Sequence, residues 1–425
     1  MTPKISKHTA SLMQKSSMMM PLAVFLLSVV VHLVVIGSAF WQEQYAVDIS
    51  DEPRYVFYAE SIRAGQGMHA PGYDHATAYV MPAVPVLFAA IGPDSLVRLR
   101  TGQLVLCGLI AVVTYLFAKR LSGDNPYVAW IAVIMLLANL GWVLQPVFLM
   151  TEPLFTLCLL LATFWIACHP EDWRYLAGAG IALGLAWLTR GALIGPLLLI
   201  FPCIWWRSGF RKMMLVGVVM GIVISPWVIR NYIAFGTPVA TSSQSGNVLA
   251  GAYNDEIYKN PWGDGWVNPD ELYKDEVSEE FFNDEIAYSN YLAKRGREWI
   301  LDNPEKLPKL MAAHVFGFVR PWPKITRNDT EFLYELFSWS VGVVLITIGG
   351  IYALRQRHQP LIFAFLIILG GFITGLIFFA IPRYRLPFAP LFALIEAAAV
   401  WQIWLRLPKN ASLKSHPDRI AGESS

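Results

Sequence analysis

The chain has 425 residues, of which 55% are hydrophobic and only 15% are charged. A soluble domain carries roughly 25% charged residues. With a mean hydropathy of +0.46, the apolar side chains are too many for one water-facing core, so most of them are expected to face lipid. A soluble enzyme is therefore excluded. The net charge of +2 gives no argument for nucleic acid as a partner.

The N-terminal segment predicts a membrane anchor. Three lysines precede an apolar run from about Met19 to Phe40. At roughly 20 residues, this run is too long for the apolar region of a cleaved signal peptide. We therefore expect an uncleaved anchor that follows a cytoplasmic tail at residues 1–18.

Apolar segments along the rest of the chain predict about ten membrane-spanning helices. They begin near residues 20, 101, 127, 150, 174, 191, 213, 335, 360 and 386. Lysines and arginines gather at alternate ends of these segments, and cytoplasmic loops carry an excess of these residues. The sequence therefore predicts an all-α polytopic integral membrane protein, with a transmembrane core at 19–230, C-terminal transmembrane helices at 335–405 and a cytoplasmic tail at 406–425.

The same alternation places two long polar stretches on the extracytoplasmic side, at residues 42–100 and 231–334. The first contains the apolar piece 80–91, which is too short to cross a bilayer and predicts a helix at the interface. The second is predicted to be helical from 270 to 299, before Asn303-Pro304. Water-soluble chemistry is expected in these two loops.

Acidic residues lie at the extracytoplasmic ends of two predicted spans. Asp51 and Glu52 follow the first span, and Glu152 opens the fourth from the same side. A solvated acidic turn explains the first pair equally well, but an acid next to lipid is costly unless it is used or paired. A carboxylate in this setting can act as a base. These three carboxylates could also hold a divalent cation, Mg or Mn, and that alternative stays open.

Several arginines also lie at these outer ends, against the usual excess of positive charge on the cytoplasmic side. An anionic ligand such as a lipid phosphate would explain them as a group. For any single arginine, pairing with a nearby acid or reaching to the interface is an equal alternative. The candidates are Arg54, Arg98, Arg190, Arg383 and Arg385.

Short motifs, in order along the chain, indicate a family. They are Asp51-Glu52, Thr151-Glu152-Pro153, Gly184 to Arg190, Arg230-Asn231-Tyr232, Gly246-Asn247, Gly251 to Asn254, and Arg383 to Pro387. Together they resemble the polyprenyl-phosphate-sugar-dependent glycosyltransferases of the GT-C superfamily. The most similar branch holds the protein mannosyltransferases and the lipid A aminoarabinose transferases.

The resemblance implies a GT-C-like helical bundle that takes a sugar from a polyprenyl-phosphate donor and passes it to a lipid, glycan or protein acceptor on the outer face. It also implies that Asp51 is the catalytic acidic residue of the first loop. Two departures leave the sugar and the acceptor open. The segment from Gly251 to Asn254 reads Gly-Ala-Tyr-Asn where relatives often have Gly-Asn-Asn-Pro, and His314 stands where a lysine is common.

The residues present agree with this chemistry. Polyprenyl phosphate is a good leaving group, so transfer needs a base for the acceptor hydroxyl and cations for the departing phosphate. We expect Asp51 to be the base, Glu52 and Glu152 to orient the substrates, and some of the five arginines above to bind phosphate. A single displacement would invert the anomeric centre. Loop contacts to the substrates are expected from Tyr55, Gly246, Asn247, Asn254 and His314.

Two rival functions stay open. A transporter or flippase for a lipid-linked sugar would share the lipid contacts and should show broken spans in paired repeats near the bilayer midplane. A non-catalytic binder of the same lipid is the second rival. The polar residues gather at one face instead, which favours an enzyme. Short loops favour a bacterial inner membrane with the active face in the periplasm. Glu396, inside the last span, has no assigned partner.

Overall fold

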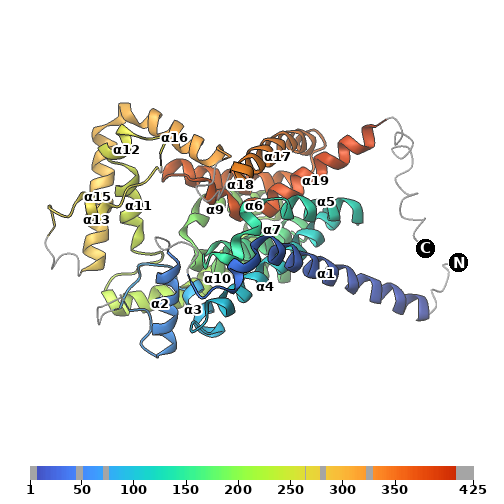
Figure 1. The fold of residues 1–425 in the computed structure, drawn as a ribbon, viewed down its shortest axis with the longest axis horizontal. Coiled ribbons are helices and arrows are strands. Elements are labelled where there is room, and N and C mark those ends of the chain that lie inside the picture. Colours follow the sequence, from blue (N-terminus) through green and yellow to red (C-terminus); the bar gives the residue numbers. More distant parts are fainter. Residues whose placement is uncertain are drawn as a thin grey trace.

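A computed structural model describes residues 7–44, 51–69, 76–263, 265–277, 284–321 and 329–407 of the chain. In these ranges the chain forms helices joined by turns, together with one isolated bridge between His69 and Ala76. The predicted all-α class is confirmed for them. Figure 1 shows long helices packed together in one part of the molecule and shorter helices gathered at one end of it.

Seven helices in these ranges are long and apolar enough to cross a membrane, so the chain is an integral membrane protein. α1 (Lys7–Ile36) and η1 (Gly37–Trp41) carry the first of them, from Met19. The others are α4 (Leu96–Leu121), η3 (Gly191–Leu193) with α9 (Ile194–Ser208), α10 (Phe210–Phe235), α17 (Asp329–Arg355), α18 (Gln359–Ile377), and η5 (Pro382–Phe388) with α19 (Ala389–Arg406).

The predicted number of about ten spans is not confirmed. α5 (Pro126–Leu137) and the segment Leu140–Val147 form an eighth span only if the pair, bent by 77°, is counted as one. α7 (Glu152–Cys168) and α8 (Trp173–Thr189) have 17 residues each. Their length of about 26 Å falls short of the roughly 30 Å of a bilayer core. Both helices pack within the bundle, α7 against α4 and α8 against α10.

Glycines let α8 approach α10 closely. A Cβ atom on Gly180 would lie 2.8 Å from the carbonyl oxygen of Val216, and one on Gly184 would lie 2.6 Å from the Cβ of Val223. Because a Cβ atom at these distances would clash with α10, small residues are needed along this face of α8. The close packing fixes the C-terminal end of α8, which Arg190 follows directly.

The polar stretches form short helices at one end of the bundle, away from the start of α1 and the end of α19 (Figure 1). The first stretch carries α2 (Glu52–Arg63) and α3 (Ala83–Ile91), so a helix is found where residues 80–91 predict one. The second carries α11 (Gln244–Ala252), α12 (Asp255–Lys259), α13 (Pro269–Leu272), α15 (Glu285–Asp302), η4 (Pro304–Lys306) and α16 (Leu307–Val319).

The prediction of one helix from 270 to 299 is wrong. α13 ends at Leu272, and α15 begins only at Glu285. The carboxylate of Asp284 accepts a hydrogen bond of 2.9 Å from the backbone N–H of Ala287. Such a cap starts a new helix and competes with a continuous one. The predicted end before Asn303-Pro304 is confirmed, because α15 ends at Asp302.

Hydrogen bonds join the two polar stretches into one cap over the bundle. The Glu285 carboxylate accepts from the hydroxyl of Thr77 at 2.5 Å and from the backbone N–H of Ala78 at 2.8 Å. Arg230, near the end of α10, donates to the carbonyl oxygens of Thr77 at 2.9 Å and Met68 at 3.0 Å. The segment at Thr77 is therefore held by both the second loop and a membrane helix.

Glu285→Ala is expected to loosen this joint. Hydrogen bonds to a charged group contribute roughly 1.5–3 kcal/mol each, so amide exchange at residues 76–79 should rise by at least tenfold. Hydrogen–deuterium exchange of the detergent-solubilised protein measures it. Glu298→Ala is the matched control, since Glu298 lies on the same helix and pairs with Lys294 on the surface at 3.6 Å. Unchanged exchange at 76–79 would show that Glu285 does not hold the loops together.

Candidate functional site

Glu152 is the centre of a buried charge cluster. It is the first residue of α7, and its side chain is fully buried. Arg190 Nη1 lies 2.7 Å from Glu152 Oε1. Arg383 Nε lies 2.5 Å from the same oxygen, and Arg383 Nη2 lies 3.3 Å from Oε2. Two guanidinium groups on one carboxylate leave a net positive charge, which favours an anion beside them.

Three separate parts of the chain build this cluster. Arg190 follows the last residue of α8, where the backbone becomes extended, and Arg383 lies in η5 just before α19. The side chain of Arg190 is 18% exposed and that of Arg383 is 27% exposed. Both arginine side chains are therefore partly exposed, although the carboxylate that holds them is buried.

Two tyrosines border the cluster. The guanidinium of Arg190 lies 4.8 Å from the centre of the Tyr384 ring. Tyr55, on α2, is buried and interacts electrostatically with Asp51, Arg383 and Glu152. Burial raises the pKa of Tyr55, and the Asp51 carboxylate adds to this effect. The phenol therefore stays protonated and can donate a hydrogen bond.

Asp51 lies at the edge of the cluster, where water can reach it. It precedes α2, and its side chain is 38% exposed. One carboxylate oxygen lies 3.2 Å from Arg54 Nη1, and the Arg54 guanidinium lies 4.6 Å from the centre of the Tyr79 ring. Asp51 also interacts electrostatically with Arg383. The structure thus brings Asp51 and Tyr55 within electrostatic range of Arg383, while Arg54 pairs with Asp51.

Glu52 is buried and interacts with a different arginine. Consecutive residues of a helix point about 100° apart, and the buried carboxylate of Glu52 interacts electrostatically with Arg100 of α4. The expectation that Glu52 orients the substrates together with Glu152 stays a prediction.

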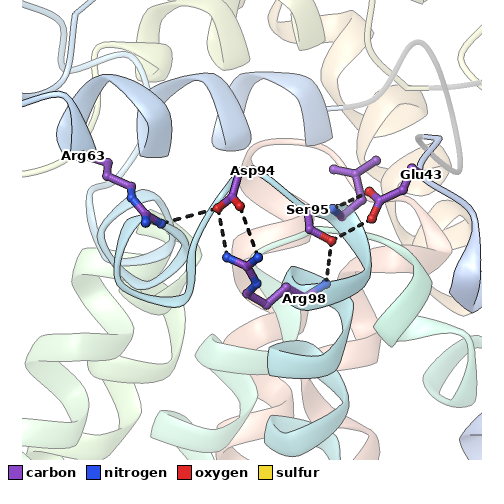
Figure 2. A network of polar contacts seen from close by, with 6 residues as sticks. Glu43, Arg63, Asp94, Ser95 and Arg98 are labelled. Atoms are coloured by element: carbon purple, nitrogen blue, oxygen red, sulfur yellow. Dashed lines mark hydrogen bonds and ion pairs between the residues drawn. The ribbon is translucent and has the colours of Figure 1, made fainter.

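Arg98 belongs to a different, exposed network. Its guanidinium donates to both oxygens of Asp94, at 2.9 and 3.1 Å, and Arg63 lies 3.5 Å from the same carboxylate. Figure 2 shows this network at the start of α4, next to Ser95 and Glu43. The predicted phosphate contact of Arg98 gives way to an i,i+4 ion pair. The sequence already carried this signal in the spacing of Asp94 and Arg98.

Arg385 also points away from Glu152. It is buried, and its Nη1 donates to the carbonyl oxygens of Phe318 at 3.0 Å and Arg320 at 2.5 Å. Its guanidinium lies 3.9 Å from the centre of the Trp339 ring. Two residues apart on a 3₁₀-helix, Arg383 and Arg385 face different directions. These contacts fasten the end of α16 to η5 and α17. Arg385 also lines the cavity described below, so its contact with phosphate stays a prediction.

The predicted loop contacts hold the second loop together internally. Gly246 packs directly on the backbone of Ser289 in α15. The Asn247 side chain donates to Asp270 at 3.4 Å. Asn254 caps α12, accepting from the N–H of Ile257 at 2.9 Å, and is buried. These contacts build α11 and its neighbours, and they engage both asparagine side chains within the second loop.

His314, on α16, is likewise part of the packing. Its Nδ1 lies 3.0 Å from the carbonyl oxygen of Leu376, and its ring meets the Tyr253 ring edge to face at 5.9 Å. Burial lowers the pKa of His314, so the ring is neutral near pH 7. The structure gives this residue a place between α11, α16 and α18, apart from the charge cluster.

An apolar cavity of about 900 Å³ adjoins the charge cluster. It lies between α5, α6 (Leu140–Val143), α17, η5 and α19, and Arg383 and Tyr384 contribute to its wall. Glu396 also lines it, roughly 10 Å along α19 from the end of η5. No sequence motif marked this cavity, because it depends on how helices distant in the chain pack together.

The residues present do not favour a metal in this arrangement. In the described ranges, no group of three His, Cys, Asp or Glu side chains could hold a metal ion. Both oxygens of Glu152 are taken by guanidinium groups. The Mg or Mn predicted on Asp51, Glu52 and Glu152 stays an untested prediction, and no step below involves a metal.

Comparison with known proteins places this geometry in context. Residues 81–241 match the family described as dolichyl-phosphate-mannose-protein mannosyltransferase. A stretch of 197 residues is 26% identical to undecaprenyl phosphate-alpha-4-amino-4-deoxy-L-arabinose arabinosyl transferase 1 of Pseudomonas fluorescens, covering 43% of this chain and 36% of that protein. ArnT from Cupriavidus metallidurans bound to undecaprenyl phosphate aligns over 89% of this chain and 77% of its own, with 15% identity and a TM-score of 0.41.

The two sequence matches confirm the resemblance that the motifs predicted. This chain spans about a third of the length of the curated relative that it matches. The matched region 81–241 contains Glu152 and Arg190, but neither Asp51 nor Arg383. The comparison therefore supports the family resemblance, whereas the residues of the site are argued from the geometry above.

Proposed function

We propose that this chain is a membrane glycosyltransferase that moves a sugar from a polyprenyl-phosphate donor to an acceptor. The observation that carries the proposal is the Glu152 cluster, which holds two arginines and of which Arg383 lines an apolar cavity. An apolar space for a tail next to paired guanidinium groups for an anion fits a lipid phosphate. One sequence relative is, by its name, an arabinosyl transferase that uses undecaprenyl phosphate-linked aminoarabinose.

Arg190 and Arg383 are placed to hold the donor phosphate. Glu152 fixes both guanidinium groups before the donor arrives, so no reorganisation is needed when the phosphate leaves with its bonding electron pair. Their fixed positive charge stabilises the polyprenyl phosphate as negative charge develops on it. Tyr55, whose phenol is protonated, is a hydrogen-bond donor for the oxygens of the same phosphate.

Asp51 is placed to activate the acceptor. In the proposed step it takes the proton from the acceptor hydroxyl while that oxygen attacks the anomeric carbon. The bond from the anomeric carbon to the phosphate oxygen breaks, and polyprenyl phosphate departs toward Arg190 and Arg383. This single displacement inverts the anomeric centre, unlike a double displacement through a covalent sugar intermediate.

The reaction is proposed to take place on the extracytoplasmic face, and in bacteria on the periplasmic side of the inner membrane. The support is the asymmetry of the charges. Lysines and arginines on the other side of the spans follow the bias of cytoplasmic loops. The helices of the two polar loops gather at one end of the bundle (Figure 1), and Tyr55 of α2 interacts electrostatically with Glu152.

A panel of polyprenyl-phosphate sugars, offered to the protein in nanodiscs together with membrane lipid or glycan acceptors, tests the proposal. We expect at least one donor to release free polyprenyl phosphate. Parallel reactions with a chelator decide whether a divalent cation is needed. No release from any donor, although donors and acceptors bind, would reject the proposal.

The transporter alternative is not favoured. Broken spans in paired repeats are typical of transporters. In the described part of the chain, one such break is found, at Ala138–Asn139 between α5 and α6, with no partner in a second repeat. The charge cluster also lies at a helix start and not at mid-depth in a span.

Ser338→Trp is expected to block the cavity and to raise the KM for a long-chain donor by at least tenfold. Ser338 of α17 lines the cavity, and an indole there removes space that the prenyl tail would occupy. Val343→Trp is the matched control, since Val343 lies on the same helix with its side chain 43% exposed and away from the cavity. Initial rates with long-chain and short-chain donors measure the effect. A KM within twofold of the wild-type value would place the tail elsewhere.

A further inference from the structure

We infer that Arg100 is a positioning residue that holds the chain segments leading to Asp51 and to Glu152 in a fixed relation. The inference rests on the proposed function, since it concerns how the base and the phosphate site are brought together. Arg100 lies in the first turns of α4, and it is 1% exposed. It contacts neither Asp51 nor Glu152 directly through any of its hydrogen bonds described below.

The first segment ends the first membrane span. Arg100 Nη1 donates to the carbonyl oxygen of Phe40 at 3.3 Å, and the guanidinium also donates to the carbonyl oxygens of Gln42 and Gln44. Asp51 follows seven residues after Gln44 in the sequence. One buried side chain thus fixes three carbonyl groups at the end of the first span, and it also interacts electrostatically with Glu52, the residue after Asp51.

Glu43 attaches the same segment to the start of α4, as Figure 2 shows. Its carboxylate accepts from the hydroxyl of Ser95 at 2.6 Å and from the backbone N–H of Leu96 at 2.7 Å. A carboxylate at a helix N-terminus is favourable, and the hydrogen bond from Ser95 lowers the pKa of Glu43. The segment is therefore attached to the start of α4 on two sides.

The second segment leads to Glu152. Arg100 Nε donates to the carbonyl oxygen of Val147 at 3.3 Å, five residues before Glu152. Gln103, one turn further along α4 and also buried, donates to the carbonyl oxygen of Met150 at 2.8 Å. The same face of α4 thus sets the positions of both approaches to the site.

Arginine is suited to this task. Its planar group offers five donors in a fixed fork, whereas lysine offers three on one mobile nitrogen. The buried carboxylate of Glu52 interacts electrostatically with Arg100 and offsets its charge. Glu52, the residue after Asp51, is therefore linked to Arg100 through its charge.

Arg100→Gln and Arg100→Lys test the inference, with Arg63→Gln as the control. Arg63 is an exposed arginine of the neighbouring network and contacts Asp94. A displacement of about 1 Å at a reacting group can cost about 100-fold in rate. We expect Arg100→Gln to lower kcat by about 10–100-fold at saturating donor with the donor Kd within twofold, and Arg100→Lys to restore only part of it. Arg63→Gln should keep the wild-type kcat.

Hydrogen–deuterium exchange supplies a readout that does not depend on activity. We expect exchange in peptides covering 36–44 and 145–151 to rise at least tenfold in Arg100→Gln, with α15 unchanged. If that variant does not fold, Gln103→Leu should increase exchange at 145–151 alone and lower kcat by 3–10-fold. Unchanged exchange and kcat in the folded variant overturn the inference. If the wild-type protein shows no turnover, the proposed function is rejected instead. The exchange measurement then still tests whether Arg100 holds the two segments.

Discussion

Asp51→Asn is expected to lower the rate of donor turnover by about 10²–10⁴-fold, the usual contribution of a general base. The amide cannot take the proton of the acceptor hydroxyl, although it has nearly the same size. Donor affinity should change by less than threefold, because Arg190 and Arg383 hold the phosphate. Release of free polyprenyl phosphate at saturating donor measures the rate.

Glu60→Gln is the matched control for this experiment. Glu60 lies two turns further along α2 with its side chain exposed to solvent. The control should keep the wild-type rate within twofold and the wild-type melting temperature. If Asp51→Asn retained more than a tenth of the wild-type rate, another group would have to be the base, and the assignment of Asp51 would be wrong.

Glu152→Gln is expected to have the largest effect on stability. It leaves Arg190 and Arg383 without their carboxylate, and breaking a buried ion pair costs about 3–5 kcal/mol. Since both guanidinium groups are partly exposed, the lower end of that range applies. The melting temperature should fall by several degrees, and turnover should fall by more than 100-fold as the arginines lose their positions.

A double-mutant cycle separates the pair from general damage. In Glu152→Gln with Arg383→Gln, the loss of stability should be smaller than the sum of the two single losses by about 1 kcal/mol or more. Thermal unfolding in the same detergent for all four proteins measures it. Additive losses, or an unchanged melting temperature in Glu152→Gln, would contradict the charge cluster as described.

The residues of the site that could be predicted from the sequence are those that lie on the same side of the membrane. Glu152, Arg190 and Arg383 each lie at the same end of an apolar segment, and alternation of the spans places those ends together. Their convergence on one buried carboxylate follows that logic. The helices of the bundle were predictable for the same reason, since long apolar runs have few other stable structures in lipid.

Other residues were misplaced because their directions depend on local geometry. Arg385 lies two residues from Arg383, yet the 3₁₀ conformation of η5 turns it toward Trp339. Two sequence patterns indicate local structure for these residues. Asp94 and Arg98 have the spacing of a helical ion pair, and Asn254 precedes two acidic residues in the pattern of a helix cap.

Neither the cavity nor the hydrogen bonds of Arg100 to two chain segments could be predicted from the sequence alone. The cavity needs α5, α17 and α19 to pack with a gap between them. Arg100 donates to backbone carbonyl groups. Because every residue has such a group, no pattern of side chains predicts these contacts. The same holds for Thr77, whose ties to Glu285 and Arg230 join parts of the chain about 150 to 200 residues apart.

The most direct test of the account measures two products of the wild-type protein in one reaction. A donor with a labelled sugar and an acceptor-containing membrane extract are supplied in nanodiscs, and free polyprenyl phosphate and labelled acceptor are quantified together. The account predicts that both appear in equal amounts and that Asp51→Asn forms neither. Donor that binds with measurable affinity but stays intact, in the presence of an acceptor that an authentic transferase can use, would contradict it.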